Sequence, residues 1–207
     1  AGAIRYALAA LKGVGAAAME SVVAERAANG PFKSLEDFAG RIDSKTLNKK
    51  MLEALACAGA FDTLDKNRAK VEGGIEILLG HGHALAHERE VGQVSLFGGE
   101  GGPSLRMGAL ADLPAWDPLE TLRREFEAVG FYLSAHPLDS RAARLKKTGA
   151  VFYADVLRRV EERGGGRFKM AGVVLRKQQK VSKSGNRYAF LQVSDPSGVY
   201  EATVFSE

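Results

Sequence analysis

The sequence predicts an α+β protein built from several modules: a helical N-terminal domain, a glycine-rich loop, a helical connector and a C-terminal β-meander. Three observations lead to this fold class. Apolar residues recur with a helical period through about residue 80, glycines then crowd residues 92–102, and apolar and polar residues alternate near the C-terminus. We therefore expect four regions, at residues 1–80, 81–116, 117–149 and 150–207.

The distribution of charge is more informative than its total. The 207 residues carry a net charge of only +4, with 45% hydrophobic and 26% charged residues, which is ordinary for a globular protein. Residues 144–207 alone hold thirteen basic and six acidic residues, a net of +7. This pattern excludes a uniformly basic molecule but allows one basic module.

Other features limit the class of protein further. The single cysteine, Cys57, excludes a disulfide framework and a cysteine-based zinc site. Arg5 and Lys12 interrupt the apolar residues of the N-terminus, so we expect neither a signal peptide nor a membrane span, and we expect a cytoplasmic location. The chain lacks an initiator Met and opens within a helical pattern, which favours a fragment of a longer protein.

The N-terminal region predicts four helices separated by sharp breaks. The first break is Lys12–Gly15, the second is Gly30-Pro31, and the third is Ala58–Phe61. The apolar positions that define the first three helices are Ile4, Ala7, Leu8 and Leu11; Met19, Val22, Val23 and Ala27; and, within residues 46–56, Leu47, Met51, Leu52 and Leu55. A fourth helix is expected over residues 68–79, weakened by Gly73 and Gly74.

The rest of the chain predicts a loop, one further helix and three strands. Residues 80–116 are expected to form a loop, because no periodic element tolerates so many glycines. A helix start is indicated by Asp117, Pro118 and Glu120. One face of this helix is expected to carry Leu119, Leu122, Phe126 and Val129, and Gly130 is expected to end it. Residues 150–207 switch to period two, with strands near 173–175, 188–193 and 199–205 and a turn at 195–198.

The segment Lys12-Gly13-Val14-Gly15 is typical of a helix-hairpin-helix motif. The helix that follows would point its unpaired N–H groups outward, and glycine lets a phosphate approach them closely. Lys12 would add a positive charge beside them. Such a site binds backbone phosphate without reading bases. The alternative is a tight helical hairpin with no ligand.

A second break at Gly59 lies in a similar frame, with Lys49 and Lys50 in the preceding helix. Two hairpins in tandem could contact both strands of duplex DNA, which favours binding. A dinucleotide fingerprint at Gly13-x-Gly15-x-x-Ala18 is excluded, because that motif must follow a strand.

Two more segments are candidates for binding. One is a peptide with two large apolar residues in a glycine-rich loop, Gln93-Val94-Ser95-Leu96-Phe97. This pattern is typical of a peptide that docks on a partner protein. The alternative is that Leu96 and Phe97 pack on the core of the domain. A basic cluster near the C-terminus precedes and flanks two aromatic residues on one strand face, which fits single-strand binding by an OB-fold; the alternative is a solvated hairpin with core aromatics. This cluster contains Arg176, Lys177, Lys180, Lys183, Arg187, Tyr188 and Phe190.

Metal and catalytic signals are weak. His81, His83 and His87 lie close in sequence, but they lack a supporting shell and are more typical of a solvated stretch. The carboxylates are scattered, no phosphate-binding GxxxxGK[ST] loop occurs, and no pairing of a nucleophile with a base can be argued. We expect no metal site, no cofactor and no catalytic residue in this chain.

The order of these parts resembles the C-terminal half of the alpha subunits of bacterial DNA polymerase III. The resemblance rests on five stretches together, and no single one is sufficient: residues 4–15, Gly30–Phe38, Leu47–Asp62, Gly92–Gly98 and Gly130–Leu138. It implies that the tandem hairpins bind duplex DNA, that Gln93, Leu96 and Phe97 dock in the β sliding clamp, and that an OB-fold lies near single-stranded template.

The resemblance also sets limits. The family's catalytic carboxylates belong to a palm domain that this chain does not match, so polymerase (nucleotidyltransferase) activity and its Mg²⁺ would belong to the whole protein. Only three of the five strands of an OB barrel are expected here. The sequence thus predicts a non-catalytic region that supports processive DNA replication together with other replicase subunits and no membrane. Two alternatives are a structural module without DNA contact and the same region of an error-prone paralogue.

Overall fold

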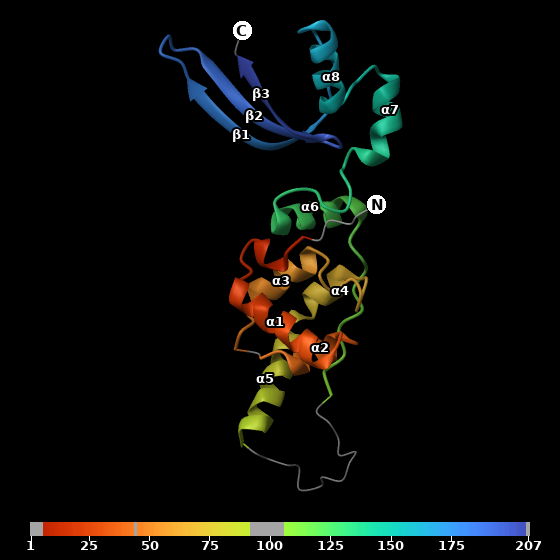
Figure 1. Cartoon of the computed structure of the whole chain (residues 1–207), viewed down its shortest axis with the longest axis vertical. Helices are drawn as coiled ribbons and strands as arrows, with labels where there is room; N and C mark the ends of the chain where they lie inside the picture. The colour runs from red at the N-terminus through yellow and green to blue at the C-terminus, as the bar shows by residue number, and fades with distance from the viewer. Residues whose placement is uncertain (1–5, 44, 92–105, 206–207) are drawn as a thin grey trace. The chain divides into compact units, whose positions relative to one another are not determined.

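The chain forms two compact units, which are described separately. The computed structural model describes residues 6–43, 45–91 and 106–205 (Figure 1). Unit 1 is Ala1–Leu133 and unit 2 is Ser134–Glu207. The two units meet within the expected connector of residues 117–149, and the four expected regions remain a prediction. Unit 1 is helical and unit 2 contains the sheet, which confirms the α+β class.

Unit 1 is a bundle of short helices, most of which begin at a side-chain cap. The 3₁₀ turn η1 is Leu8–Ala10, and the helices are α1 Ala16–Asn29, α2 Leu35–Arg41, α3 Lys49–Cys57, α4 Arg68–Gly73, α5 Ile75–Val91 and α6 Pro118–Val129. The side chains of Ser34, Asn48, Asn67 and Asp117 accept backbone N–H bonds at four of these starts. The core surrounds α3, where Leu52 and Leu55 are each 2% exposed.

The N-terminal elements correct two expectations. In the described residues before the first hairpin, the expected helix is only the turn η1, because Ala7 and Leu11 on either side are extended. The N–H of Lys12 donates to Ala128 O on α6 at 3.0 Å, so contact with α6 replaces continuation of a helix. In addition, α2 was not expected, although Ser34 followed by Asp37 is a usual helix start.

The expected fourth helix and the loop after it differ most from the structure. The helix is divided at Gly74 into α4 and α5, and α5 continues to Val91, so residues 81–91 are helical and the expected loop boundary is wrong. His81 is buried in α5. Packing of α5 on α2 explains the difference: a Cβ on Gly40 of α2 would lie only 3.1 Å from Leu85 Cδ1. Close packing thus stabilises a helix that contains glycines.

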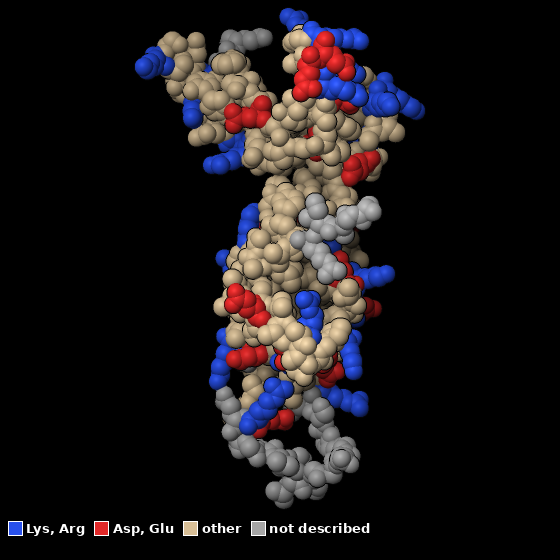
Figure 2. Space-filling model, viewed as in Figure 1, with Lys and Arg blue, Asp and Glu red and all other residues tan. Residues whose placement is uncertain are grey.

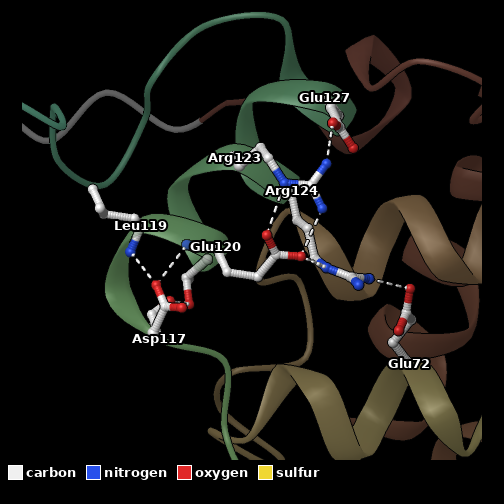
Figure 3. A network of polar contacts seen from close by, with 8 residues as sticks. Glu72, Asp117, Leu119, Glu120, Arg123, Arg124 and Glu127 are labelled. Atoms are coloured by element: carbon white, nitrogen blue, oxygen red, sulfur yellow. Dashed lines mark hydrogen bonds and ion pairs between the residues drawn. The ribbon is translucent and has the colours of Figure 1, made fainter.

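Helix α6 has the ends that the sequence predicts, but its buried residues are Leu122, Glu125, Ala128 and Val129, and Leu119 of the expected face is 53% exposed. Asp117 Oδ1 accepts the N–H groups of Leu119 and Glu120, and Gly130 ends the helix in the left-handed conformation at φ 99°. Figure 3 shows the charged network along α6, which reaches Glu72 of α4. Hydrogen bonds from Arg123 and then Arg124 lower the pKa of Glu120 to about 2.

The same network attaches α6 to the bundle. Arg124 bonds to Glu72 of α4 at 2.6 Å (Figure 3) and lies over the ring of Trp116, with Cζ 4.2 Å from the ring centroid.

Unit 2 combines two short helices with a three-stranded sheet. Its elements are η2 Asp139–Arg141, α7 Ala142–Lys147, α8 Tyr153–Arg163, β1 Val173–Val181, β2 Arg187–Asp195 and β3 Gly198–Phe205. The strands form an antiparallel meander in the order β1-β2-β3, which confirms the three predicted strands. The OB-fold remains a prediction.

Helix α8 contradicts the expectation of strand periodicity from residue 150 onward. Val156, Leu157 and Val160 instead repeat at helical spacing. The β2–β3 turn holds the start of α8, since Asp195 Oδ2 accepts the N–H of Tyr153 at 2.6 Å and Ser197 Oγ accepts that of Ala154. Within the described ranges, no helix is both long and apolar enough to cross a membrane.

Candidate nucleic-acid interface

The first hairpin exposes the start of a helix. Gly13 has φ +80°, a left-handed conformation that favours glycine. Val14 turns inward, is 7% exposed and donates its N–H to Leu11 O. Gly15 is the N-cap of α1 and has no side chain to accept the N–H groups of the first turn. Because Gly15, Ala16 and Ala17 are exposed, these donors face solvent.

A second helix start lies beside the first. The position of a Cβ on Gly13 would be 3.7 Å from Lys50 Cε, and that of a Cβ on Gly15 would be 3.8 Å from Met51 Cε. Lys50 is the second residue of α3, so the N-termini of α1 and α3 converge, with an exposed lysine between them. Both helix dipoles place partial positive charge at this surface, which suits one or two phosphate groups.

The three predicted lysines differ in their surroundings. Lys50 is exposed and next to Gly13. Lys49 forms an ion pair with Glu76 at 2.6 Å; this hydrogen bond raises the pKa of Lys49 and lowers the pKa of Glu76. Lys12 reaches toward the C-terminal end of α6, where its Nζ lies 5.9 Å from the centroid of the Phe126 ring. Lys50 is therefore the lysine best placed for a phosphate.

Gly59 lies at the opposite end of α3 and is a structural residue. The N–H groups of Ala58, Gly59 and Ala60 all donate to carbonyls of α3, so the expected free donors are absent there. A Cβ on Gly59 would lie 2.6 Å from Arg68 Cζ. Glycine thus makes room for a guanidinium, and phosphate binding around Gly59 stays a prediction that these three bonded N–H groups do not support.

Arg68 is the centre of a buried cluster that sequence patterns did not predict. It forms a two-oxygen contact with Asp62 and bonds to Glu125 Oε2 at 3.3 Å. Glu125 is fully buried and its Oε1 accepts the N–H of Leu133 at 2.9 Å. The hydrogen bond to Asp62 is the main cause that raises the pKa of Arg68. The cluster fixes α6, and with it Ala128, against the hairpin.

The basic residues predicted on the sheet do not share one face. Strand pairing aligns Lys180 with Tyr188 and Gln178 with Phe190, which places these four residues on one face together with Arg176. Lys177 pairs with Leu191 and Arg187 with Val181, on the opposite face. Lys183 lies in the connecting loop. Tyr188 and Phe190 contact each other edge to face at 5.5 Å, and Lys180 Nζ lies 5.1 Å from the Phe190 centroid.

Two other expectations concern the loop and metals. Gln93, Val94, Ser95, Leu96 and Phe97 lie outside the described residues. The described part of the chain contains no group of three His, Cys, Asp or Glu side chains that could hold a metal ion.

Comparisons with known proteins agree with the resemblance. A sequence model described as a helix-hairpin-helix motif matches residues 1–71. Proteins named DNA polymerase III subunit alpha align with nearly the whole chain: 40% identity over 97% of it in Caulobacter vibrioides, 36% over 100% in Rickettsia conorii, and 36% over 100% in Bacillus subtilis. The chain spans 17–18% of the length of these relatives. It is thus homologous to one segment of that subunit.

Proposed function

We propose that this chain is the non-catalytic DNA- and clamp-binding region of a bacterial replicative DNA polymerase, and that it supports processive replication. The observation that carries the proposal is the pair of helix N-termini at Gly13 and Lys50, since adjacent exposed donors suit backbone phosphate. Homology to a DNA polymerase III subunit alpha segment supports the same partner.

The DNA part is tested with two neighbouring lysines that differ in position. Lys50→Ala should weaken binding of a fluorescent blunt duplex and reduce the slope of log K against log salt by about 0.9, the loss of one phosphate contact. Lys49→Ala removes the same charge from the same helix but from an ion pair with Glu76, so its effect should be smaller. Equal effects of the two variants, or none, would contradict a placed phosphate site and favour a structural module.

The clamp part concerns Gln93–Phe97, whose Leu96 and Phe97 would fill a hydrophobic cleft of a β sliding clamp. DNA bound at the hairpins would hold this peptide close to the clamp, so a weak peptide becomes effective through a high local concentration. The double change of Leu96 and Phe97 to Ala should abolish capture by an immobilised clamp while duplex binding persists. Clamp capture equal to that of the unchanged chain would refute this part.

A further inference from the structure

Unit 2 contains a groove between α7 and α8 that no sequence pattern predicted. Its volume is about 770 Å³, which is within the usual range for ligand sites. Side chains of α7 form one wall, those of α8 form the other, and the connecting segment forms the floor. The lining residues are Ala142, Ala143, Lys146, Gly149, Ala150, Val151, Phe152, Asp155, Arg158 and Arg159.

The floor of this groove is held in place by backbone bonds. Gly149 leaves α7 with φ +77°, and the N–H of Val151 donates to Lys169 O at 2.9 Å. At the other end, Asp195 accepts the N–H of Tyr153. Because the segment before β1 and the β2–β3 turn fix the floor from both sides, little order has to be gained when a ligand binds.

The walls of the groove present more cationic than anionic groups. Arg158 bonds to Asp155 at 2.8 Å. Lys146 on α7 and Arg159 on α8 are exposed, and the described residues provide neither with an ion-pair partner. Figure 2 shows Lys and Arg side chains gathered over α7 and α8, with fewer carboxylates among them. Two unpaired cations on facing walls favour an anionic ligand.

A neighbouring hollow extends the groove along α8. It has a volume of about 610 Å³ and shares Arg158 and Arg159 with the first groove. It is also lined by Arg163, by one carboxylate, Glu162, by the glycines 164–166 and by Phe168. The ligand surface is therefore a track with cations along its length. Phe152 in one part and Phe168 in the other are half-buried rings. A long anion with flat apolar groups matches this lining better than a compact one.

We propose that the α7–α8 track binds the sugar–phosphate backbone of a single DNA strand. Small residues on the floor leave room for one flexible strand, the cations meet its phosphates, and the two phenylalanine rings offer faces to its bases. The sheet cluster is less suitable, because its basic residues are divided between two faces. This proposal does not depend on the duplex site of unit 1, which involves other residues.

The test measures binding of fluorescein-labelled oligo(dT) to the full 207-residue chain by anisotropy over a range of salt concentrations. The double variant Lys146→Ala with Arg159→Ala should reduce the salt slope by about 1.4, because each lost phosphate contact of a single strand accounts for about 0.7. Its affinity at low salt should fall about tenfold, while binding of a blunt duplex through unit 1 remains.

The matched control is the double variant Arg144→Ala with Lys147→Ala, which removes the same charge from exposed positions of α7 outside the groove lining. It should retain most of the oligo(dT) affinity, and circular dichroism should show both variants folded. Equal losses in both variants would indicate diffuse attraction and overturn the proposal. A loss of oligo(dT) affinity that occurs only in the double variant Arg176→Ala with Lys180→Ala would overturn the proposal and place the single strand on the sheet. Binding of an acidic peptide more tightly than oligo(dT) would also overturn it and assign the track to a protein partner.

Discussion

Replacement of Gly13 by alanine separates backbone strain from phosphate binding. In the folded chain, an alanine in the left-handed conformation costs about 1–2 kcal/mol. In the unfolded chain, alanine has less conformational entropy than glycine, and this difference offsets about 0.4–1 kcal/mol of that cost. The added Cβ would lie 3.7 Å from Lys50 Cε, an ordinary contact, so packing adds little. We expect a net loss of about 1 kcal/mol in the free energy of unfolding, and a melting temperature lower by a few degrees.

The expected effect on DNA is larger than this loss of stability. The new methyl group would stand beside the exposed N–H groups of α1 and keep a phosphate from its close approach. Duplex affinity should fall at least about fivefold, with a salt slope reduced by about 0.9 for one lost phosphate contact. Anisotropy with a labelled duplex at three salt concentrations gives both quantities, and thermal unfolding gives the stability.

The control is Gly30→Ala at the other end of α1. Gly30 has φ 81° and ψ 177°, a region that only glycine populates readily, and a Cβ there would meet nothing within 4 Å. This variant should lose at least as much stability as Gly13→Ala while retaining duplex affinity. If both variants lose affinity in proportion to stability, or if Gly13→Ala binds like the unchanged chain, the phosphate site at the hairpin is refuted.

Two further predictions concern buried polar groups. Glu125→Ala should lower the free energy of unfolding, measured in urea, by about 3 kcal/mol, because Arg68 loses a buried partner. The control Glu127→Ala, at a side chain 60% exposed, should change it by less than about 0.5 kcal/mol. Similar losses in both variants would contradict a stabilising role of the buried Arg68–Glu125 pair. Burial lowers the pKa of His136, whose Nδ1 accepts the N–H of Leu138.

The unfolded chain therefore takes up a proton at this histidine before the folded chain does, so stability should fall as the pH drops below about 6.5. Thermal unfolding at pH 7.5 and 5.5 should show this loss, and the loss should shrink in His136→Gln. An unchanged pH dependence would reject the role of His136.

Local patterns predicted the elements that depend on local chemistry. The ends of α6 follow from Asp117 and Gly130, and the three strands follow from alternation and the turn at Asp195. The errors occurred where tertiary contacts outweigh propensity. Glycines within α5 suggested a loop, yet α5 packs on α2 at Gly40 and stays helical. The expected first helix is likewise only a single turn, because the N–H of Lys12 bonds to Ala128 of α6 and does not continue a helix.

The candidate site was predictable only in part. Gly13-Val14-Gly15 is a local motif, so its geometry could be expected from sequence. Its neighbour, the start of α3, is more than 30 residues away. The sequence named Lys49 and Lys50 there, but no local pattern shows that they lie beside Gly13. The α7–α8 track could have been found from charge, since eight of the thirteen basic residues in 144–207 lie outside the sheet cluster.

The division of charge between the units explains why the two proposed DNA surfaces should behave differently. Unit 1 holds 15 basic and 18 acidic residues, whereas unit 2 holds 14 basic and 7 acidic residues. A unit with net charge −3 repels DNA at long range, so it can bind only through donors placed in contact with phosphate. A unit with net charge +7 attracts DNA before contact, and its affinity should depend more steeply on salt. If both proposed surfaces bind DNA, unit 2 should speed encounter with a strand, and the helix N-termini of unit 1 should determine how a duplex is held.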